Sequence, residues 1–435
     1  MALVLLCAIS AALARPRPAR AAATTATSAM NGWSLHGLSP SDLNAQLALM
    51  ESEGVRVLRV DASWSSIQPQ EPTATGPSYS WIAEDAEVAA LAAHHIEWLP
   101  LVDYSAPWAA TDLGDWRSPP ADDAQFADFA AAIAARYGPG GTFWLQNPQL
   151  PFEPVDTFEI WNEENGDYFW DTGPDPAAYA RLYLTARSAI DAVDPAAEVM
   201  VGGLTNPRQG MSALQFIAEM FQDDPGLAGN VDAIGLHPYA TTPQGVVSNV
   251  AQARTLLDSL GQDATTIDIT EFGWQVGATA AAEQQRAEMM SAVAQELGNS
   301  NCGVGLIAPY DWMDPSYITG GDWGLAGSSG LRPAGASWFG GLTAAAQAPQ
   351  TTPCQPSPAV GSIPPAGVAA PAAVAAPAAV AAPGAGTATP GAASGSRPAA
   401  HPRSRRAHRR RPARRRPAHA RRHPHRRPST RLRGR

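Results

Sequence analysis

Eight short apolar runs recur between residues 33 and 339, and an amphipathic stretch long enough for a helix separates each run from the next. This alternation is typical of parallel strands joined by crossover helices. The expected strands are Trp33–Gly37, Val55–Asp61, Ile96–Val102, Val155–Asn162, Val199–Gly203, Val231–His237, Ile267–Glu271 and Gly303–Tyr310. A repeat of about 38 residues predicts an α/β fold, the (β/α)8 TIM barrel. An open doubly wound sheet is the alternative, but no glycine-rich phosphate turn follows an early strand.

Two of the intervening segments carry helix start signals. Residues Asp123–Tyr137 place their apolar side chains on one face, with Ser118 and the prolines after it as the expected start signal. In the next helix Asp175 is the expected cap and Pro176 lies in the first turn.

The ends of the chain differ in composition from the barrel, which we expect to occupy residues 30–346. Residues 1–23 combine an apolar run with small residues that suit signal peptidase, so we expect a signal peptide and a secreted or cell-surface protein. A frayed cytosolic N-terminus is the alternative. Residues 347–396 are expected to be a Pro/Ala-rich linker, and residues 397–435 an Arg/His-rich basic disordered tail. The apolar run is too short for a transmembrane segment.

Charge is divided unequally along the chain. The net charge of −10 combines an acidic body with a tail that contains 17 of the 30 basic residues, and there is no lysine. The absence of a lysine amine excludes a Walker phosphate loop, a Schiff-base enzyme and a protein kinase. The tail is expected either to bind anionic cell-envelope polymers or to have no specific partner. Nucleic acid is not expected, since the acidic body would repel it, and we expect a monomer.

Three cysteines are present, and Cys7 would leave with the signal peptide. In an exported protein, the remaining pair, Cys302 and Cys354, is expected to form one disulfide that ties the segment after the barrel to its last strand.

Glutamates follow two of the expected strands, the fourth and the seventh. Glu163 lies in the run FEIWNEEN and Glu271 in the run ITEFGW, and their spacing equals three strand-plus-helix units. Active sites of such barrels lie at the carboxyl ends of the strands. One protonated and one ionised carboxyl group across a cleft are what cleavage of a glycosidic bond requires.

Two strings carry a resemblance to a known family. Trp161-Asn162-Glu163 and Thr270-Glu271-Phe272-Gly273-Trp274 resemble the acid/base and nucleophile motifs of the clan A retaining glycoside hydrolases. The run EIWNEENGDYFW, with the later VMVGG, is similar to glycoside hydrolase family 39, with the cellulase-like family 5 next. The likeness spans about 310 residues, from Gly32 to Leu342.

The resemblance implies a retaining β-glycosidase that hydrolyses a polysaccharide or oligosaccharide by double displacement. Glu163 would be the general acid/base and Glu271 the nucleophile. The supporting residues it implies are Asn162 at the sugar 2-hydroxyl, Arg59 beside Glu271, Tyr239 in contact with the nucleophile, and His237 at the same rim. Family members often have proline where this chain has Glu164.

Other residues are predicted from their positions alone. Trp312, after the last strand, could provide a flat apolar platform for a sugar ring, and Trp108 is a weaker candidate. Asp103 and Tyr104 are expected either to reach a neighbouring sugar or to serve as buried caps. Arg59 could instead form a structural ion pair. No metal or cofactor is expected.

Two alternative functions remain at this point. A barrel that binds glycan without turnover, anchored by its basic tail, is the first. A transglycosylase is the second, because transfer to a sugar and transfer to water start from the same covalent intermediate.

Overall fold

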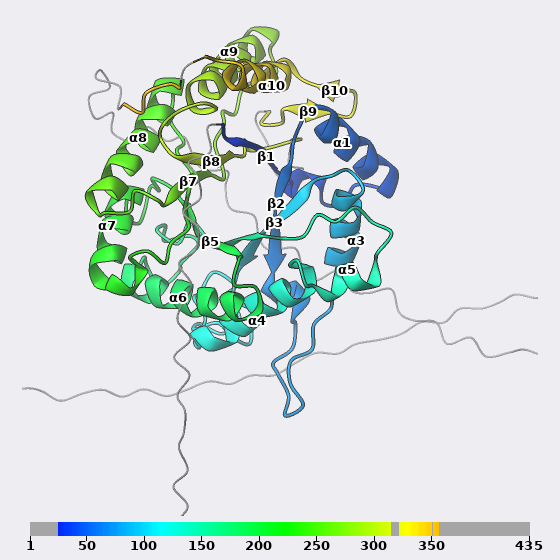
Figure 1. Ribbon diagram of the computed structural model, residues 1–435, viewed down its shortest axis with the longest axis vertical. Coiled ribbons are helices and arrows are strands. Elements are labelled where there is room, and N and C mark those ends of the chain that lie inside the picture. The colour runs from blue at the N-terminus through cyan, green and yellow to red at the C-terminus, as the bar shows by residue number, and fades with distance from the viewer. Residues whose placement is uncertain (1–24, 315–321, 350, 356–435) are drawn as a thin grey trace, which may run out of the picture. The chain divides into compact units, whose positions relative to one another are not determined.

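Eight parallel strands close into a barrel in sequence order, with helices around the outside (Figure 1). This computed structural model describes residues 25–314, 322–349 and 351–355. The strands are β1 (Thr27–Asn31), β2 (Val57–Ser63), β3 (Glu97–Asp103), β4 (Thr157–Asn162), β5 (Glu198–Leu204), β6 (Ala233–Leu236), β7 (Thr266–Ile269) and β8 (Val304–Ile307). Pairing of β1 with β8 closes the ring. The predicted (β/α)8 barrel is confirmed.

Helices connect the strands. They are α1 (Pro40–Ser52), α2 (Trp64–Ile67), α3 (Ile82–Ala92), α4 (Asp123–Tyr137), α5 (Thr142–Gln146), α6 (Pro176–Val193), α7 (Ala213–Asp223), α8 (Pro243–Ser259), α9 (Ala280–Leu297) and α10 (Pro333–Ala346). Two 3-10 turns, η1 (Trp33–Leu35) and η2 (Pro225–Leu227), and a small hairpin of β9 (Ala326–Gly327) and β10 (Gly330–Leu331) complete the elements. No helix in the described ranges is both long and apolar enough to cross a bilayer.

The two helix start signals have different outcomes. The cap of α6 is confirmed, because the Asp175 side chain accepts a hydrogen bond from the backbone N–H of Ala178. Helix α4 has its predicted bounds, but its cap is Asp122 rather than Ser118. The Ser118 hydroxyl instead accepts from the N–H of Asp112 and so stabilises the loop before the helix.

The first predicted strand, Trp33–Gly37, is wrong. This segment begins with the turn η1, and strand β1 lies earlier, at Thr27–Asn31. The sequence of β1 has little intrinsic strand propensity, and its pairing with β2 and β8 decides its conformation. Gly32 ends the strand at a close approach, since a Cβ there would lie 2.7 Å from the Leu58 side chain. The other seven strands overlap their predicted ranges.

Two apolar layers surround the strands. Inside the barrel, a small cluster is formed by Ala29, Leu99, Met200, Ala233, Leu306 and Ala308. A much larger layer packs between the strands and the helices and includes Trp64, Trp98, Phe129 and Trp161. Because side chains alternate across each strand, the inward positions nearer the carboxyl ends are free to carry polar groups.

The chain after α10 returns to the barrel. Cys302 and Cys354 form a disulfide, as predicted, and Thr352 pairs with Ser300 as a parallel bridge. The folded domain therefore extends beyond residue 346, into a segment that the sequence assigned to the linker. The predicted signal peptide, the basic tail and most of the linker lie outside the described residues.

We expect the Cys354→Ser variant to unfold at a temperature several degrees below that of the parent protein. The disulfide closes a loop of 52 residues, and restricting an unfolded loop of that size stabilises a fold by about 2–4 kcal/mol. Thermal unfolding with and without reductant measures this effect. Reductant should lower the parent's midpoint to that of the variant and leave the variant unchanged. Equal midpoints for the two oxidised proteins would contradict the prediction.

Candidate active site

The residues singled out in the sequence converge at the carboxyl ends of the strands. Arg59 points inward from β2, Asn162 ends β4, and Glu163 follows directly. His237 follows β6, and Glu271 follows β7. Parallel strands bring their carboxyl ends to one rim of the barrel, so residues more than 200 positions apart become neighbours there.

The backbone at the end of β4 is unusual. Trp161 and Glu163 have φ angles of 71° and 50°, in the left-handed region that residues with a Cβ rarely adopt. Each such residue costs about 1–3 kcal/mol, and the surrounding structure must hold it in place. The Glu163 N–H donates to the Gly203 carbonyl oxygen, and the Glu163 carbonyl oxygen accepts from Gly166. This strained turn directs the Glu163 side chain toward the barrel axis.

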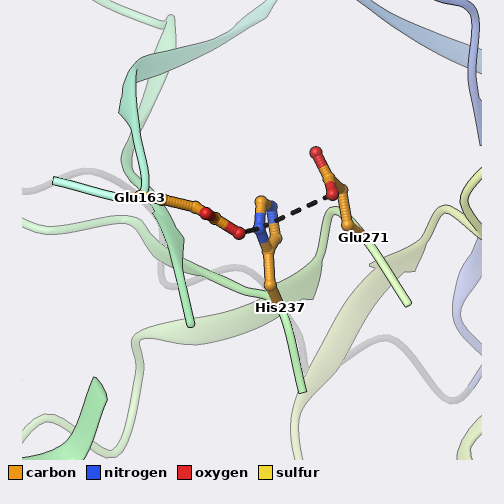
Figure 2. Close-up of side chains that lie close together, drawn as sticks. All are labelled: Glu163, His237 and Glu271. Carbon is orange, nitrogen blue, oxygen red and sulfur yellow. Dashed lines mark hydrogen bonds and ion pairs between the residues drawn. The ribbon is translucent and has the colours of Figure 1, made fainter. Parts of the chain in front are cut away.

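His237 lies between the two carboxyl groups, as Figure 2 shows. Its Nδ1 is 2.9 Å from Glu163 Oε1 and 3.8 Å from Glu271 Oε2. The nearest oxygens of Glu163 and Glu271 are no more than 4.8 Å apart. Retaining glycosidases hold their two carboxyl groups about 5–5.5 Å apart, whereas inverting enzymes separate them by about 6.5–9.5 Å. The spacing of Glu163 and Glu271 is closer to the shorter of these separations than to the longer one.

A glycine makes room for the imidazole. A Cβ at Gly203 would lie 2.0 Å from His237 Nε2, so no other residue fits beside the ring in this position. Burial and the positive charge of Arg59 hold the pKa of His237 well below its ordinary value. The ring is therefore neutral and hydrogen-bonded to Glu163.

Arg59 is the buried cation of the site, with 4% of its surface exposed. Its Nη1 donates to Glu271 Oε1 at 2.8 Å, and its Nε donates to Glu159 Oε2 at 2.5 Å. Its Nη2 also donates to Glu159 Oε1 at 3.2 Å, and the amide oxygens of Asn31 and Asn162 accept further hydrogen bonds from Arg59. Burial alone would lower the pKa of Arg59, but the two carboxylates outweigh burial and raise it. The guanidinium is permanently charged.

Burial raises the pKa values of both Glu271 and Glu163, but their charged and hydrogen-bonding neighbours differ. The pKa of Glu271 is raised by burial, and Arg59 and a 3.0 Å hydrogen bond from the Tyr239 hydroxyl partly oppose this by favouring the ionised form. Burial and the negative charge of Glu271 together hold the pKa of Glu163 well above its usual range. Two carboxyl groups whose environments separate their pKa values are suited to the roles of acid and nucleophile. Arg59 and Tyr239 therefore favour Glu271 over Glu163 as the ionised member of the pair.

The adjacent glutamate has a different environment. Glu164 is fully buried, and its carboxyl group packs against Gly202, where a Cβ would lie 2.5 Å from Oε2. Burial raises the pKa of Glu164 to about 8. The strained turn thus sends two successive side chains in different directions, and only Glu163 reaches His237.

The two predicted tryptophan platforms lie in packed positions. Trp312 is fully buried, and its indole N–H donates to Gln46 Oε1 at 2.8 Å. Trp108 donates to the Gln68 carbonyl oxygen and packs edge-on against Trp64. Burial leaves Trp312 with no ring face for a sugar, so this structure does not support its predicted role.

Asn31 and Glu159 belong to the site, although the sequence did not indicate them. Asn31 donates to the Thr270 carbonyl oxygen at 2.7 Å and accepts from Arg59. It was missed because the first strand was assigned to the wrong segment. Glu159 lies two residues before Trp161 in the sequence, in the same run as Glu163. Its position on the inner face of β4 was the signal that could have identified it.

A cation could in principle be held by Glu163, His237 and Glu271, whose donor atoms cluster. The Arg59 guanidinium already neutralises Glu271 from 2.8 Å away and opposes a second positive charge there. We therefore assign no metal to this site.

No protein-family model and no curated protein matches the sequence. Solved structures do match. A family 39 β-xylosidase from Caulobacter crescentus is 21% identical, with a TM-score of 0.52 over 73% of this chain and 70% of that one. A family 39 enzyme from Xanthomonas axonopodis is 19% identical, with a TM-score of 0.54 over 73% and 65% of the two chains. The chain shares the (β/α)8 barrel fold of these family 39 structures.

A third solved structure has a similar fold. A family 39 glycoside hydrolase from Bacteroides cellulosilyticus is 15% identical and has a TM-score of 0.55 over 74% of this chain and 64% of that one. At such identities the likeness concerns the fold alone. The chemistry of this barrel is therefore argued from its own residues.

We expect Tyr239→Phe to raise the pKa of Glu271 by about one pH unit, because a hydrogen bond to the ionised carboxylate is lost. Titration of glutamate side chains by carbon-13 NMR measures this, and the signal missing from Glu271→Gln identifies the residue. Tyr168→Phe, at an exposed tyrosine, is the matched control and should change nothing. An unaltered pKa in Tyr239→Phe would show that its hydroxyl does not stabilise the charge.

Proposed function

We propose that the protein is a retaining β-glycosidase that hydrolyses a polysaccharide or oligosaccharide. The observation that carries this proposal is the pair of buried carboxyl groups within 4.8 Å of one another, one placed to hold a proton and one to hold a charge. The family 39-like fold supports it, and one of the matching structures is described as a β-xylosidase.

In the first step the ionised Glu271 attacks the anomeric carbon of the sugar. The bond from that carbon to the leaving oxygen breaks, and Glu163 transfers its proton to that oxygen. The products are a glycosyl ester on Glu271 and a free alcohol. Arg59 and Tyr239 hold the carboxylate of Glu271 in position for attack through hydrogen bonds to its two oxygens.

In the second step Glu163 acts as a base. The ester has removed the charge of Glu271, which had raised the pKa of Glu163, so that pKa falls and the carboxylate persists. It accepts a proton from water as the water oxygen attacks the anomeric carbon, and Glu271 leaves as a carboxylate. His237 keeps the Glu163 carboxyl oriented through both steps.

We also propose that the protein acts outside the cytoplasm, either secreted or attached to the cell surface through its basic tail. The disulfide between Cys302 and Cys354 supports this, since such bonds persist in oxidising compartments. Transglycosylation is the second candidate for the reaction, because a sugar hydroxyl could replace water in the second step.

We expect the full chain to release sugar from at least one member of a panel of plant, fungal and bacterial polysaccharides and aryl β-glycosides. Glu271→Gln should release none, because it removes the nucleophile. Product analysis with an added sugar acceptor separates hydrolysis from transfer. A folded parent that releases nothing from the whole panel would overturn the proposal in favour of a barrel that only binds glycan.

The adjacent glutamates provide a second test. Glu163→Gln should lower turnover of substrates with poor leaving groups by about 10²–10⁴-fold, the usual contribution of a general acid. Activated aryl glycosides should lose less in the first step, because their leaving groups need no proton. Glu164→Gln is the matched control. It should stay within a few-fold of the parent at pH 6, where a carboxyl group with a pKa of about 8 is neutral. The opposite result would reverse the assignment.

A further inference from the structure

A shallow cavity of about 430 Å³ lies among the loops that follow β3 and β4. Residues 112–117, in the loop after β3, and Tyr168, in the loop after β4, form its lining. Both loops follow the carboxyl ends of strands, so the cavity opens on the same face of the barrel as Glu163. Its volume is within the range of small-molecule binding sites.

A continuous chain of aromatic contacts connects this cavity to the catalytic turn. The ring of Trp116 lies 4.7 Å from that of Tyr104, and Tyr104 lies 5.5 Å from Trp161. Trp161 immediately precedes Asn162 and Glu163. Two ring contacts therefore link the cavity to the turn that carries Glu163.

The cavity exposes apolar surface to water. Among the described residues the large hydrophobic side chains that stand out as exposed are Ile82, Leu113, Leu145, Phe152, Tyr168 and Val193. Two of these, Leu113 at 74% and Tyr168 at 43%, lie in this one cavity. Clustered exposed apolar side chains on a soluble protein commonly mark a binding surface.

Hydrogen bonds and a ring contact already hold the polar side chains at the edge of the cavity in place. The Arg117 guanidinium donates two hydrogen bonds to the Asp115 carboxylate and lies 5.3 Å from the centre of the Tyr168 ring. The backbone joins the two loops as well, since the N–H of Asp171 donates to the Arg117 carbonyl oxygen. The site needs little rearrangement on binding, which favours affinity.

An exposed aromatic ring next to a hydrogen-bonding carboxylate and guanidinium matches the chemistry of a sugar ring. A pyranose offers an apolar face of C–H groups, which an aromatic ring can cover, and a rim of hydroxyl groups. Asp115 can accept hydrogen bonds from those hydroxyls, and Arg117 can donate to them. Asp112 and Asp115 outnumber the one arginine, so the cavity favours a neutral sugar over an anionic one.

We propose that this cavity is a distal subsite that binds a neutral pyranose unit of the substrate chain, away from the scissile bond. The proposal rests on the proposed function and extends it. It makes the protein an enzyme that prefers oligosaccharides or polysaccharides over short glycosides, because distal contacts contribute only when the substrate is long enough to reach them.

The test compares Tyr168→Ala with the parent full chain on an oligosaccharide series of two to six units and on the aryl glycoside of the same sugar. For the longer oligosaccharides kcat/KM should fall about tenfold, mainly through KM, as the loss of one stacking contact predicts. For the aryl glycoside it should stay within about twofold of the parent. Tyr168→Phe keeps the ring and should restore the parent values. Phe152→Ala removes an exposed aromatic ring that precedes β4 and should have no effect.

Each outcome is decisive. Equal losses on the aryl glycoside and the long oligosaccharides, or no loss on either, would overturn the subsite while leaving the glycosidase proposal intact. If the parent cleaves nothing, the proposed function fails, and glycan-array binding by the parent and Tyr168→Ala decides the subsite instead. Binding that weakens in the variant supports the subsite, and the absence of binding by the parent overturns it.

Discussion

The buried guanidinium of Arg59 is the interaction on which the rest of the site depends. It contacts side chains from β1, β4 and the end of β7 while projecting from β2, so one cation joins four strands of the barrel. A buried charge requires partners, and removing one member of such a group leaves the others uncompensated. The carboxylates of Glu159 and Glu271 and the charge of Arg59 are therefore interdependent.

The same charge also differentiates the titrating groups around it. It favours the ionised form of Glu271 and the neutral form of His237. Glu163 lies farther from Arg59 and is influenced mainly by burial and by the charge of Glu271. The asymmetric position of this arginine thus contributes to the difference in proton affinity that the proposed acid and nucleophile require. Gly203 completes the arrangement by leaving space for the imidazole between them.

Most of the barrel could be predicted because buried parallel strands leave a strong apolar pattern. Seven strands and the limits of α4 followed from that pattern, and the two motif glutamates stood at strand ends. Strand β1 could not be recognised, since its residues form no apolar run and its conformation comes from pairing with β2 and β8. Trp312 was predicted to be a sugar platform, but its position after a strand does not reveal whether the ring is buried in the core or exposed at the rim of the barrel.

By itself the sequence determined the fold class, the strand ends that carry glutamates and the residue types available for catalysis, because these depend on local pattern and composition. Only the tertiary structure decided which of two adjacent glutamates meets His237, since left-handed backbone at Trp161 and Glu163 sets their directions. It also decided the Arg59 network and the aromatic cavity around Trp116. These depend on distances between segments far apart in the chain, and such distances exist only once the barrel has closed.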